Sequence, residues 1–221
     1  MKRESVFGGL LCLLVSFSAS LLAQDSSRAP KGVHTSEKSQ IRLPARVEAT
    51  LTKIYSNLGP PKNAYNGADG YLVGGPNSEF GQQFAGLPFT PATNSTVTVI
   101  HVPLTYYGSG ANQVNLSLYT DVGGVPGMII AGPHTFKNLP AFGTCCTLVT
   151  WHLRTGVSVT AATQYRLVAD TPATGTGSDT AAIWDDQLPV YLEAFNQGDG
   201  EGWLPYNGDQ FLAGAVLGTV P

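Results

Sequence analysis

Short strands separated by turns are the dominant pattern along this chain. Across residues 114–119 apolar and polar side chains alternate, which predicts a half-buried strand with Val114, Leu116 and Leu118 on one face. Other short apolar or alternating runs predict further strands at 52–55, 82–85, 97–104, 128–131, 148–153, 164–169, 181–184 and 211–217. The chain therefore presents many short strands rather than helices.

Turn-forming residues lie between these runs. The segment from Asp121 to Gly127 contains two adjacent glycines, which adopt positive φ without strain, and Pro126, which cannot donate a ladder hydrogen bond. The chain has 26 Gly and 15 Pro, a composition that favours turns over helices. Because no alternation of strands with helices is present, we expect an all-β fold, an antiparallel β-sandwich or jelly roll.

The N-terminus has the layout of a cleavable export signal. Lys2 and Arg3 precede an apolar run that ends at Ala23, and polar residues follow. A membrane anchor is the alternative, but the run is near the low end of the roughly 17–25 residues that span a bilayer. We expect a signal peptide at 1–23, a flexible leader at 24–47 and one β-sandwich domain at 48–221, with secretion to the extracellular space and no membrane span after cleavage.

The charges divide the chain into a basic leader and an acidic domain. From Gln24 to Lys62 seven basic residues face three acidic ones, and beyond Lys62 three basic residues face eleven acidic ones, a balance of 3 − 11 = −8. Nucleic acid binding requires a positive surface, so the domain is not expected to bind it. An acidic surface is also common for solubility alone, so the charge identifies no partner.

The order of several sequence blocks resembles a known family. The blocks are Ile-Tyr-Ser-Asn-Leu-Gly at 54–59, Gln-Gln-Phe at 82–84, Leu-Tyr-Thr-Asp-Val-Gly-Gly-Val-Pro-Gly at 118–127, Thr-Gln-Tyr-Arg-Leu-Val at 163–168 and the closing run 211–218. Together they resemble the choice-of-anchor R domains of secreted bacterial proteins. The resemblance implies an extracellular or cell-surface β-sandwich without an established catalytic role. Members of that family often end in an anchor segment, and because this sequence stops at Pro221 without one, we expect free secretion.

Cys145 and Cys146 are the only cysteines after the expected signal cleavage. An oxidising compartment favours a bond between them. Neighbouring Cα atoms are only about 3.8 Å apart, below the usual disulfide range of about 4.4–6.8 Å, so a vicinal disulfide would form a tight, strained ring. Such a ring offers a flat sulfur surface to a ligand. The alternatives are a stiff loop without binding function and two reduced, buried thiols.

The acidic residues suggest calcium rather than catalysis. Carboxylates in Gly-rich loops suit Ca²⁺, and the candidate ligands are Asp121, Asp199 and Glu201. A glycan hydrolase needs two carboxylates roughly 5–10 Å apart. Asp185 and Asp186 are neighbours in a predicted strand, where side chains alternate between faces, so the second carboxylate would have to come from elsewhere, such as Glu193. Solvated turns remain the alternative for the loops.

Aromatic residues at strand ends are candidate ligand contacts. Flat rings beside Asn, Asp and Gln suit sugars, whereas the same rings could equally pack in the core or at its rim. We expect Trp151 and Trp184, which lie in predicted strands, to be core residues. The candidate ligand-binding residues are Trp203, Tyr206, Tyr106 and Tyr107.

The sequence therefore predicts a secreted, non-catalytic β-sandwich module. No nucleophile elbow, phosphate-binding loop or metalloprotease motif is present in the sequence. The expected ligand is a glycan or another cell-surface or matrix component. The alternatives are a structural subunit of an extracellular assembly, which self-associates through an open strand edge, and a glycan-acting hydrolase.

Overall fold

A computed structural model describes residues 29–34, 51–60, 64–143, 147–187, 192–207 and 211–221. Within these residues every regular element is a β-strand, so the protein is all-β, as the sequence predicts. The strands are β1 (Gly32–His34), β2 (Thr52–Ser56), β3 (Asn66–Gly74), β4 (Phe84–Phe89), β5 (Ser95–Val102), β6 (Leu104–Ser109), β7 (Gln113–Val122), β8 (Val125–Lys137), β9 (Val149–Val159), β10 (Tyr165–Asp170), β11 (Ala181–Gln187), β12 (Leu192–Asn196), β13 (Trp203–Asn207), β14 (Phe211–Leu212) and β15 (Ala215–Thr219).

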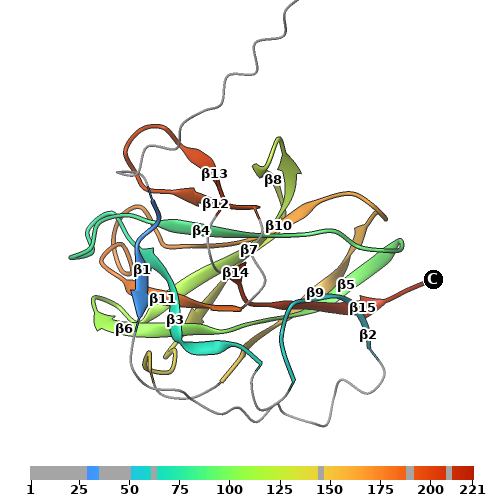
Figure 1. Cartoon of the computed structure of the whole chain (residues 1–221), viewed down its shortest axis with the longest axis horizontal. Coiled ribbons are helices and arrows are strands. Elements are labelled where there is room, and N and C mark those ends of the chain that lie inside the picture. Colours follow the sequence, from blue (N-terminus) through green and yellow to red (C-terminus); the bar gives the residue numbers. More distant parts are fainter. Residues whose placement is uncertain (1–28, 35–50, 61–63, 144–146, 188–191, 208–210) are drawn as a thin grey trace, which may run out of the picture.

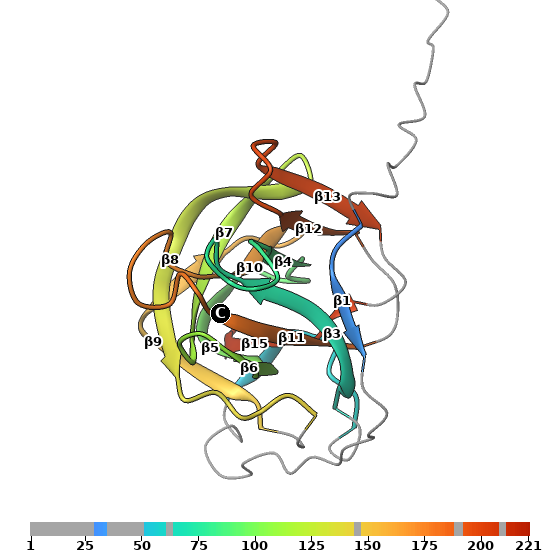
Figure 2. The same ribbon diagram turned by 90° about the vertical axis from the view of Figure 1, so that its left-hand side faces the viewer.

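These strands form three sheets in which every strand pair of the described residues is antiparallel. The β11 sheet has the order β1-β3-β11-β14, with β6 also paired to β11. The β10 sheet has the order β13-β12-β4-β10-β7-β8, and the β15 sheet has the order β2-β15-β5-β9. Figure 1 shows β1 alongside β3 on one side of the molecule, and Figure 2 shows the same pair from a direction at right angles.

One apolar core cluster draws residues from all three sheets. Val114, Leu116 and Leu118 are fully buried in it, which confirms the face that the alternation along β7 predicts. Trp151 and Trp184 also belong to this cluster, as expected. One of two smaller clusters consists of Leu72, Ala181 and Ile183, with Val33 and Phe142 packed against it, and lies on the other face of the β11 sheet.

Five described strands lie entirely or almost entirely outside the runs recognised in the sequence: β1, β3, β6, β12 and β13. β3 has the sequence Asn-Gly-Ala-Asp-Gly-Tyr-Leu-Val-Gly, in which glycines resemble a loop, yet most of its residues are buried on both faces. Gly70 explains one glycine, because an added Cβ would lie 2.5 Å from Ile183 Cγ2 and from the Trp184 carbonyl oxygen. β1 lies within the stretch expected to be a flexible leader.

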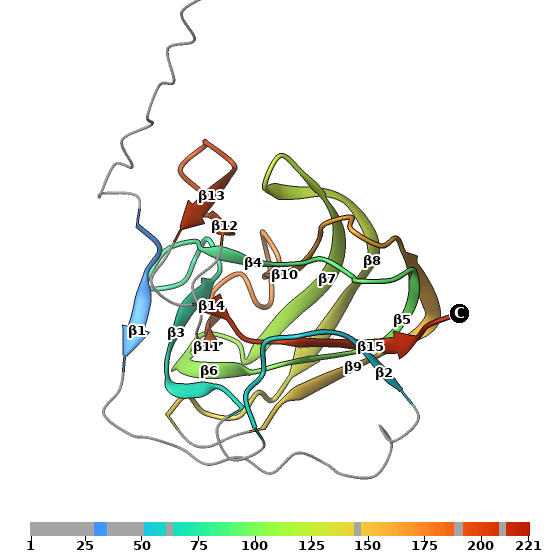
Figure 3. The same cartoon turned by 45° about the vertical axis from the view of Figure 1, so that its right-hand side comes forward.

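Two hairpins project at the same end of the molecule (Figure 3). One is formed by β12 and β13, and the other by β7 and β8, whose register shifts three times between Leu116 and Asp121. The turn of the second hairpin has Gly123 at φ 64° and Gly124 at φ 90°, the conformation that the two glycines predict. In the part of the chain that the structure describes, no helix has the length and apolar character needed to cross a membrane.

Candidate functional site

Strand alternation separates the two neighbouring tyrosines of β6. Tyr106 packs against the main core cluster, and its hydroxyl donates a 2.6 Å hydrogen bond to the Gly110 carbonyl oxygen. Tyr107 follows directly and therefore points to the opposite face of the β11 sheet, where its side chain remains 37% exposed. Only Tyr107 of this pair is thus available to a ligand on the outer face of that sheet.

Tyr107 lines a pocket of about 360 Å³ on this outer face. The lining residues come from β1 and the residue before it, from β3, from β6 and from the turn before β4: Lys31, Gly32, Val33, Leu72, Phe80 and Tyr107. The Phe80 and Tyr107 rings meet edge to face with centroids 5.3 Å apart, and Tyr107 is 5.7 Å from Phe142 on its other side. Aromatic lining with a few polar groups at this size is typical of small-ligand sites, which measure about 300–1,000 Å³.

The turn that carries Phe80 is fixed by its own hydrogen bonds. The Ser78 amide donates to the Gly75 carbonyl at 3.0 Å, the Gly81 amide donates to the Ser78 carbonyl at 3.0 Å, and the Ser78 hydroxyl donates to the Gly81 carbonyl at 3.0 Å. Phe80 therefore stays 37% exposed in a well-defined turn rather than in a loose loop. A large ring held out of the core in this way is consistent with binding.

The buried side-chain amide of Gln83 fixes the Lys31 segment on the other side of the pocket. Gln83, which is fully buried, accepts a 2.8 Å hydrogen bond from the Lys31 amide through Oε1. Its Nε2 donates to the Leu72 carbonyl at 3.0 Å and to the Lys31 carbonyl at 3.4 Å. The Leu72 amide also donates to the Lys31 carbonyl at 3.0 Å. The segment that carries Lys31 is thus attached to β3 by side-chain as well as main-chain contacts.

The other two candidate aromatic residues lie on opposite faces of β13. Tyr206 pairs with Glu193 in the register and packs edge to face on the core residue Phe195, with centroids 5.8 Å apart. Trp203 has the opposite parity and lies on the outer face of the β10 sheet, where its ring approaches Gly86. The structure therefore does not combine Trp203 and Tyr206 in one surface, because a spacing of three residues changes face in a strand.

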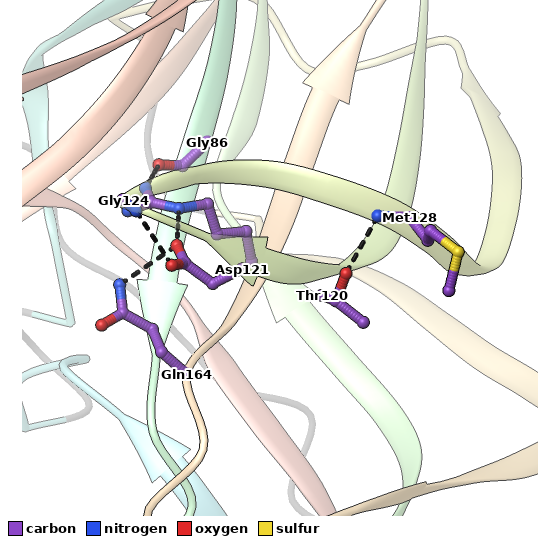
Figure 4. A network of polar contacts seen from close by, with 7 residues as sticks. Gly86, Thr120, Asp121, Gly124, Met128 and Gln164 are labelled. Carbon is purple, nitrogen blue, oxygen red and sulfur yellow. Dashed lines mark hydrogen bonds and ion pairs between the residues drawn. The ribbon is translucent and has the colours of Figure 1, made fainter.

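Asp121, a candidate calcium ligand, is engaged by protein groups (Figure 4). Its Oδ2 atom lies 2.5 Å from Nε of Arg166 and accepts a 3.4 Å hydrogen bond from Gln164, and its Oδ1 atom accepts a 3.0 Å hydrogen bond from the Gly124 amide. Burial lowers the pKa of the Arg166 guanidinium, and the hydrogen bond from it to Asp121 raises that pKa. Nη1 of Arg166 donates to the Gly86 carbonyl at 3.2 Å. Asp121 thus fastens the β7–β8 turn to Arg166 of β10, which in turn contacts β4.

The remaining candidate calcium ligands lie in the loop between β12 and β13. Oδ1 of Asp199 accepts a 3.1 Å hydrogen bond from the Glu201 amide, and both residues are exposed. No group of three or more His, Cys, Asp or Glu side chains among the described residues is arranged to hold a metal ion, and Asp121, Asp199 and Glu201 form no such group. Cys145 and Cys146 lie outside the described residues, so the vicinal disulfide stays a prediction.

The acidic residues considered for hydrolysis are interior groups. Asp185 and Glu193 are fully buried and Asp186 is nearly so. Burial raises the pKa of Asp185 and of Glu193 well above their usual range, and burial followed by the charge of Asp69 raises the pKa of Asp186 to about 8. Oε1 of Glu193 accepts a 2.5 Å hydrogen bond from the Leu212 amide. These carboxyl groups therefore serve the packing between strands rather than a surface cleft.

Of the six residues that line the pocket, sequence reasoning identified only Tyr107 and missed the other five, including Phe80 and Lys31. The signal for Phe80 was present, because a large aromatic residue stands in the polar, turn-rich segment Pro-Asn-Ser-Glu-Phe-Gly at 76–81. No comparable signal exists for Lys31, which lies far from Leu72, Phe80 and Tyr107 in the sequence. Its place depends on the pairing of β1 with β3.

No family model matches this chain, no curated protein matches it, and no solved structure matches its fold. The resemblance to choice-of-anchor R domains therefore stays a prediction. A function for this protein has to be argued from the pocket itself.

Proposed function

We propose that this protein is an exported β-sandwich of the jelly-roll kind that binds a glycan in the pocket lined by Phe80 and Tyr107. The observation that carries the proposal is the pair of rings, each 37% exposed, that line a pocket of about 360 Å³ with the buried Leu72. Sugars present apolar C–H faces that stack on aromatic rings, while their hydroxyl groups need polar partners at the rim.

The sandwich and its location are part of the same proposal. Three antiparallel sheets contribute to one core cluster, which supports a layered sandwich or jelly roll. The export-signal layout of residues 1–23 supports a secreted, extracellular protein, released or associated with the cell surface. The resemblance to choice-of-anchor R domains supports the same location and a non-catalytic role.

A glycan array followed by titration calorimetry tests the binding function. We expect Tyr107→Ala to lower affinity for the selected glycan about tenfold, because half of the edge-to-face pair is removed. Trp203→Ala is the matched control, since Trp203 lies on another sheet, and its affinity should equal that of the wild type. The proposal fails if the folded protein binds no glycan, or if Tyr107→Ala and Phe80→Ala both bind like the wild type.

A structural subunit of an extracellular assembly is the second candidate. The tip of the β7–β8 hairpin favours it, because Val122, Met128 and Ile129 are 63%, 72% and 46% exposed. Exposed apolar residues gathered on one hairpin are typical of contact surfaces. Sedimentation velocity of the wild type and of Met128→Ser distinguishes the candidates: an assembly that the substitution dissolves supports the subunit, and a monomer at all concentrations excludes self-assembly.

A further inference from the structure

Lys31 places a positive charge at the pocket of Phe80 and Tyr107. Its ammonium group donates a 2.5 Å hydrogen bond to the main-chain carbonyl oxygen of Phe80, the residue whose ring lines the pocket together with Tyr107. Lys31 is the only charged residue among the six that line the pocket. Any ligand that stacks on these rings therefore has a cation next to it.

The ammonium group has capacity for a further partner. A lysine carries three N–H donors, and among the described residues the carbonyl of Phe80 is the acceptor that its side chain contacts. No carboxylate of the described residues lies within 4.0 Å of it. The Lys31 charge is therefore not neutralised by the described part of the protein.

The position of Lys31 is set before any ligand arrives. Both its amide and its carbonyl bind the fully buried Gln83 side chain, at 2.8 Å and 3.4 Å. Rigid attachment of the main chain reduces the entropy lost when the side chain engages a ligand. The cation is thus presented on a fixed segment rather than on a free leader.

The Lys31 charge stands out because the rest of the domain is acidic. Beyond Lys62 the sequence carries three basic and eleven acidic residues. Without the buried Asp185, Asp186 and Glu193 and without the Arg166–Asp121 pair, two basic residues face seven acidic ones. A surface of that sign repels polyanions over long range. An anionic ligand is therefore recognised through a local contact and not through a general basic patch.

We propose that the ligand of this pocket is an acidic sugar, with its ring against Tyr107 and Phe80 and its carboxylate accepting hydrogen bonds from Lys31. This inference rests on the proposed glycan-binding function and adds the chemical class of the sugar, a uronic acid residue. Neutral hexoses stack on the same rings but leave the ammonium without an anionic partner.

The test compares two oligosaccharides of equal length and linkage, one built from uronic acid and the other from the corresponding neutral hexose. Calorimetry with the wild type should show about fivefold tighter binding of the uronate, the upper range for an exposed ion pair. Lys31→Gln should remove this preference without changing affinity for the neutral sugar, and Lys31→Arg should restore it. Lys53→Gln, which changes an exposed lysine on β2, is the control.

The outcomes separate this inference from the function on which it rests. Equal binding of both sugars, unchanged by Lys31→Gln but weakened by Tyr107→Ala, overturns the acidic-sugar inference and keeps the glycan-binding pocket. Absence of binding to either sugar, or binding that Tyr107→Ala and Phe80→Ala leave intact, overturns both. Thermal unfolding of each variant verifies that the fold is retained.

Discussion

Arg166 and Asp121 form a buried ion pair in which Nε lies 2.5 Å from Oδ2. The Arg166 side chain is fully buried and the Asp121 side chain is 11% exposed. Because Asp121 lies next to the turn at Gly123 and Gly124 and Arg166 lies in β10, the pair holds the turn end of the β7–β8 hairpin against the neighbouring strand. The ion pair therefore fixes the position of the hairpin segment that bears the exposed residues Val122, Met128 and Ile129.

Removal of one partner should be far more costly than removal of both. We expect Asp121→Ala to lower the free energy of unfolding by about 3–5 kcal/mol, because an unpaired guanidinium would remain buried. The double variant Asp121→Ala/Arg166→Met should recover a large part of this loss. Urea denaturation measures both; an additive result, with the double variant less stable than either single one, would contradict the expectation.

The buried carboxyl groups predict a stability that falls with rising pH. The pKa of Asp186 is about 8 in the folded protein against an ordinary value of 3.8, and burial raises those of Asp185 and Glu193 as well. The folded state thus holds protons that the unfolded state releases. The stabilisation is fully present below about pH 4 and is lost as pH rises to about 8.

Asp186→Asn tests this pH dependence, because the amide keeps the neutral form at every pH. Its free energy of unfolding should fall less than that of the wild type between about pH 5 and about pH 8. The surface substitution Asp199→Asn is the control and should leave the slope unchanged. Equal slopes for the wild type and Asp186→Asn would show that Asp186 titrates normally.

Two glycines with similar backbone angles should respond differently to alanine. Gly123 has φ 64° with open space around the Cβ position, whereas Gly110 has φ 69° and an added Cβ would lie 1.9 Å from the Asp179 carbonyl oxygen. Gly123→Ala should cost about 1–2 kcal/mol from the left-handed backbone alone. Gly110→Ala should cost a further ~1–3 kcal/mol for the displaced neighbour. Thermal and urea unfolding of the two variants check the order.

The stability of the pocket depends on one buried side chain, that of Gln83. Gln83→Ala removes hydrogen bonds to Lys31 and Leu72, so the free energy of unfolding should fall by about 1–3 kcal/mol. The Lys31 amide, which donates to Gln83 Oε1 at 2.8 Å, should exchange with solvent faster. Gln82→Ala, which removes a half-buried contact to Asn196, is the control and should leave exchange at Lys31 unchanged.

The local pattern of apolar and polar residues predicted the strands with one buried and one exposed face, and it missed those with two similarly buried faces. β7 was predicted with its core face because Val114, Leu116 and Leu118 alternate with polar residues. β3 carries glycines where neighbouring chains approach closely, and this requirement follows from the sheet and not from the sequence around it. β1 acquires its structure only by pairing with β3.

The candidate site could be predicted only in part for a related reason. Tyr107 was recognised as a candidate ligand contact, but its partners Phe80 and Lys31 come from segments that long-range pairing brings together. Strand alternation is a signal that separates the other two candidates: Trp203 and Tyr206 are three positions apart, and residues an odd number of positions apart in a strand such as β13 lie on opposite faces. Burial of Asp185 and Glu193 depends on how the sheets pack, which no local pattern encodes.

The pairing of β1 with β3 has a consequence for the behaviour of the protein in solution. Without β1, the segment Asp69–Tyr71 of β3, with which β1 pairs, would form an open sheet edge, a template for pairing with other molecules. Loss of the Gln83 contacts should therefore promote aggregation as well as instability, and light scattering of Gln83→Ala at rising concentration measures it. β1 thus protects the edge of β3 from pairing between molecules. The colloidal solubility of the domain therefore depends on three residues, of which Val33 also packs against the cluster of Leu72, Ala181 and Ile183.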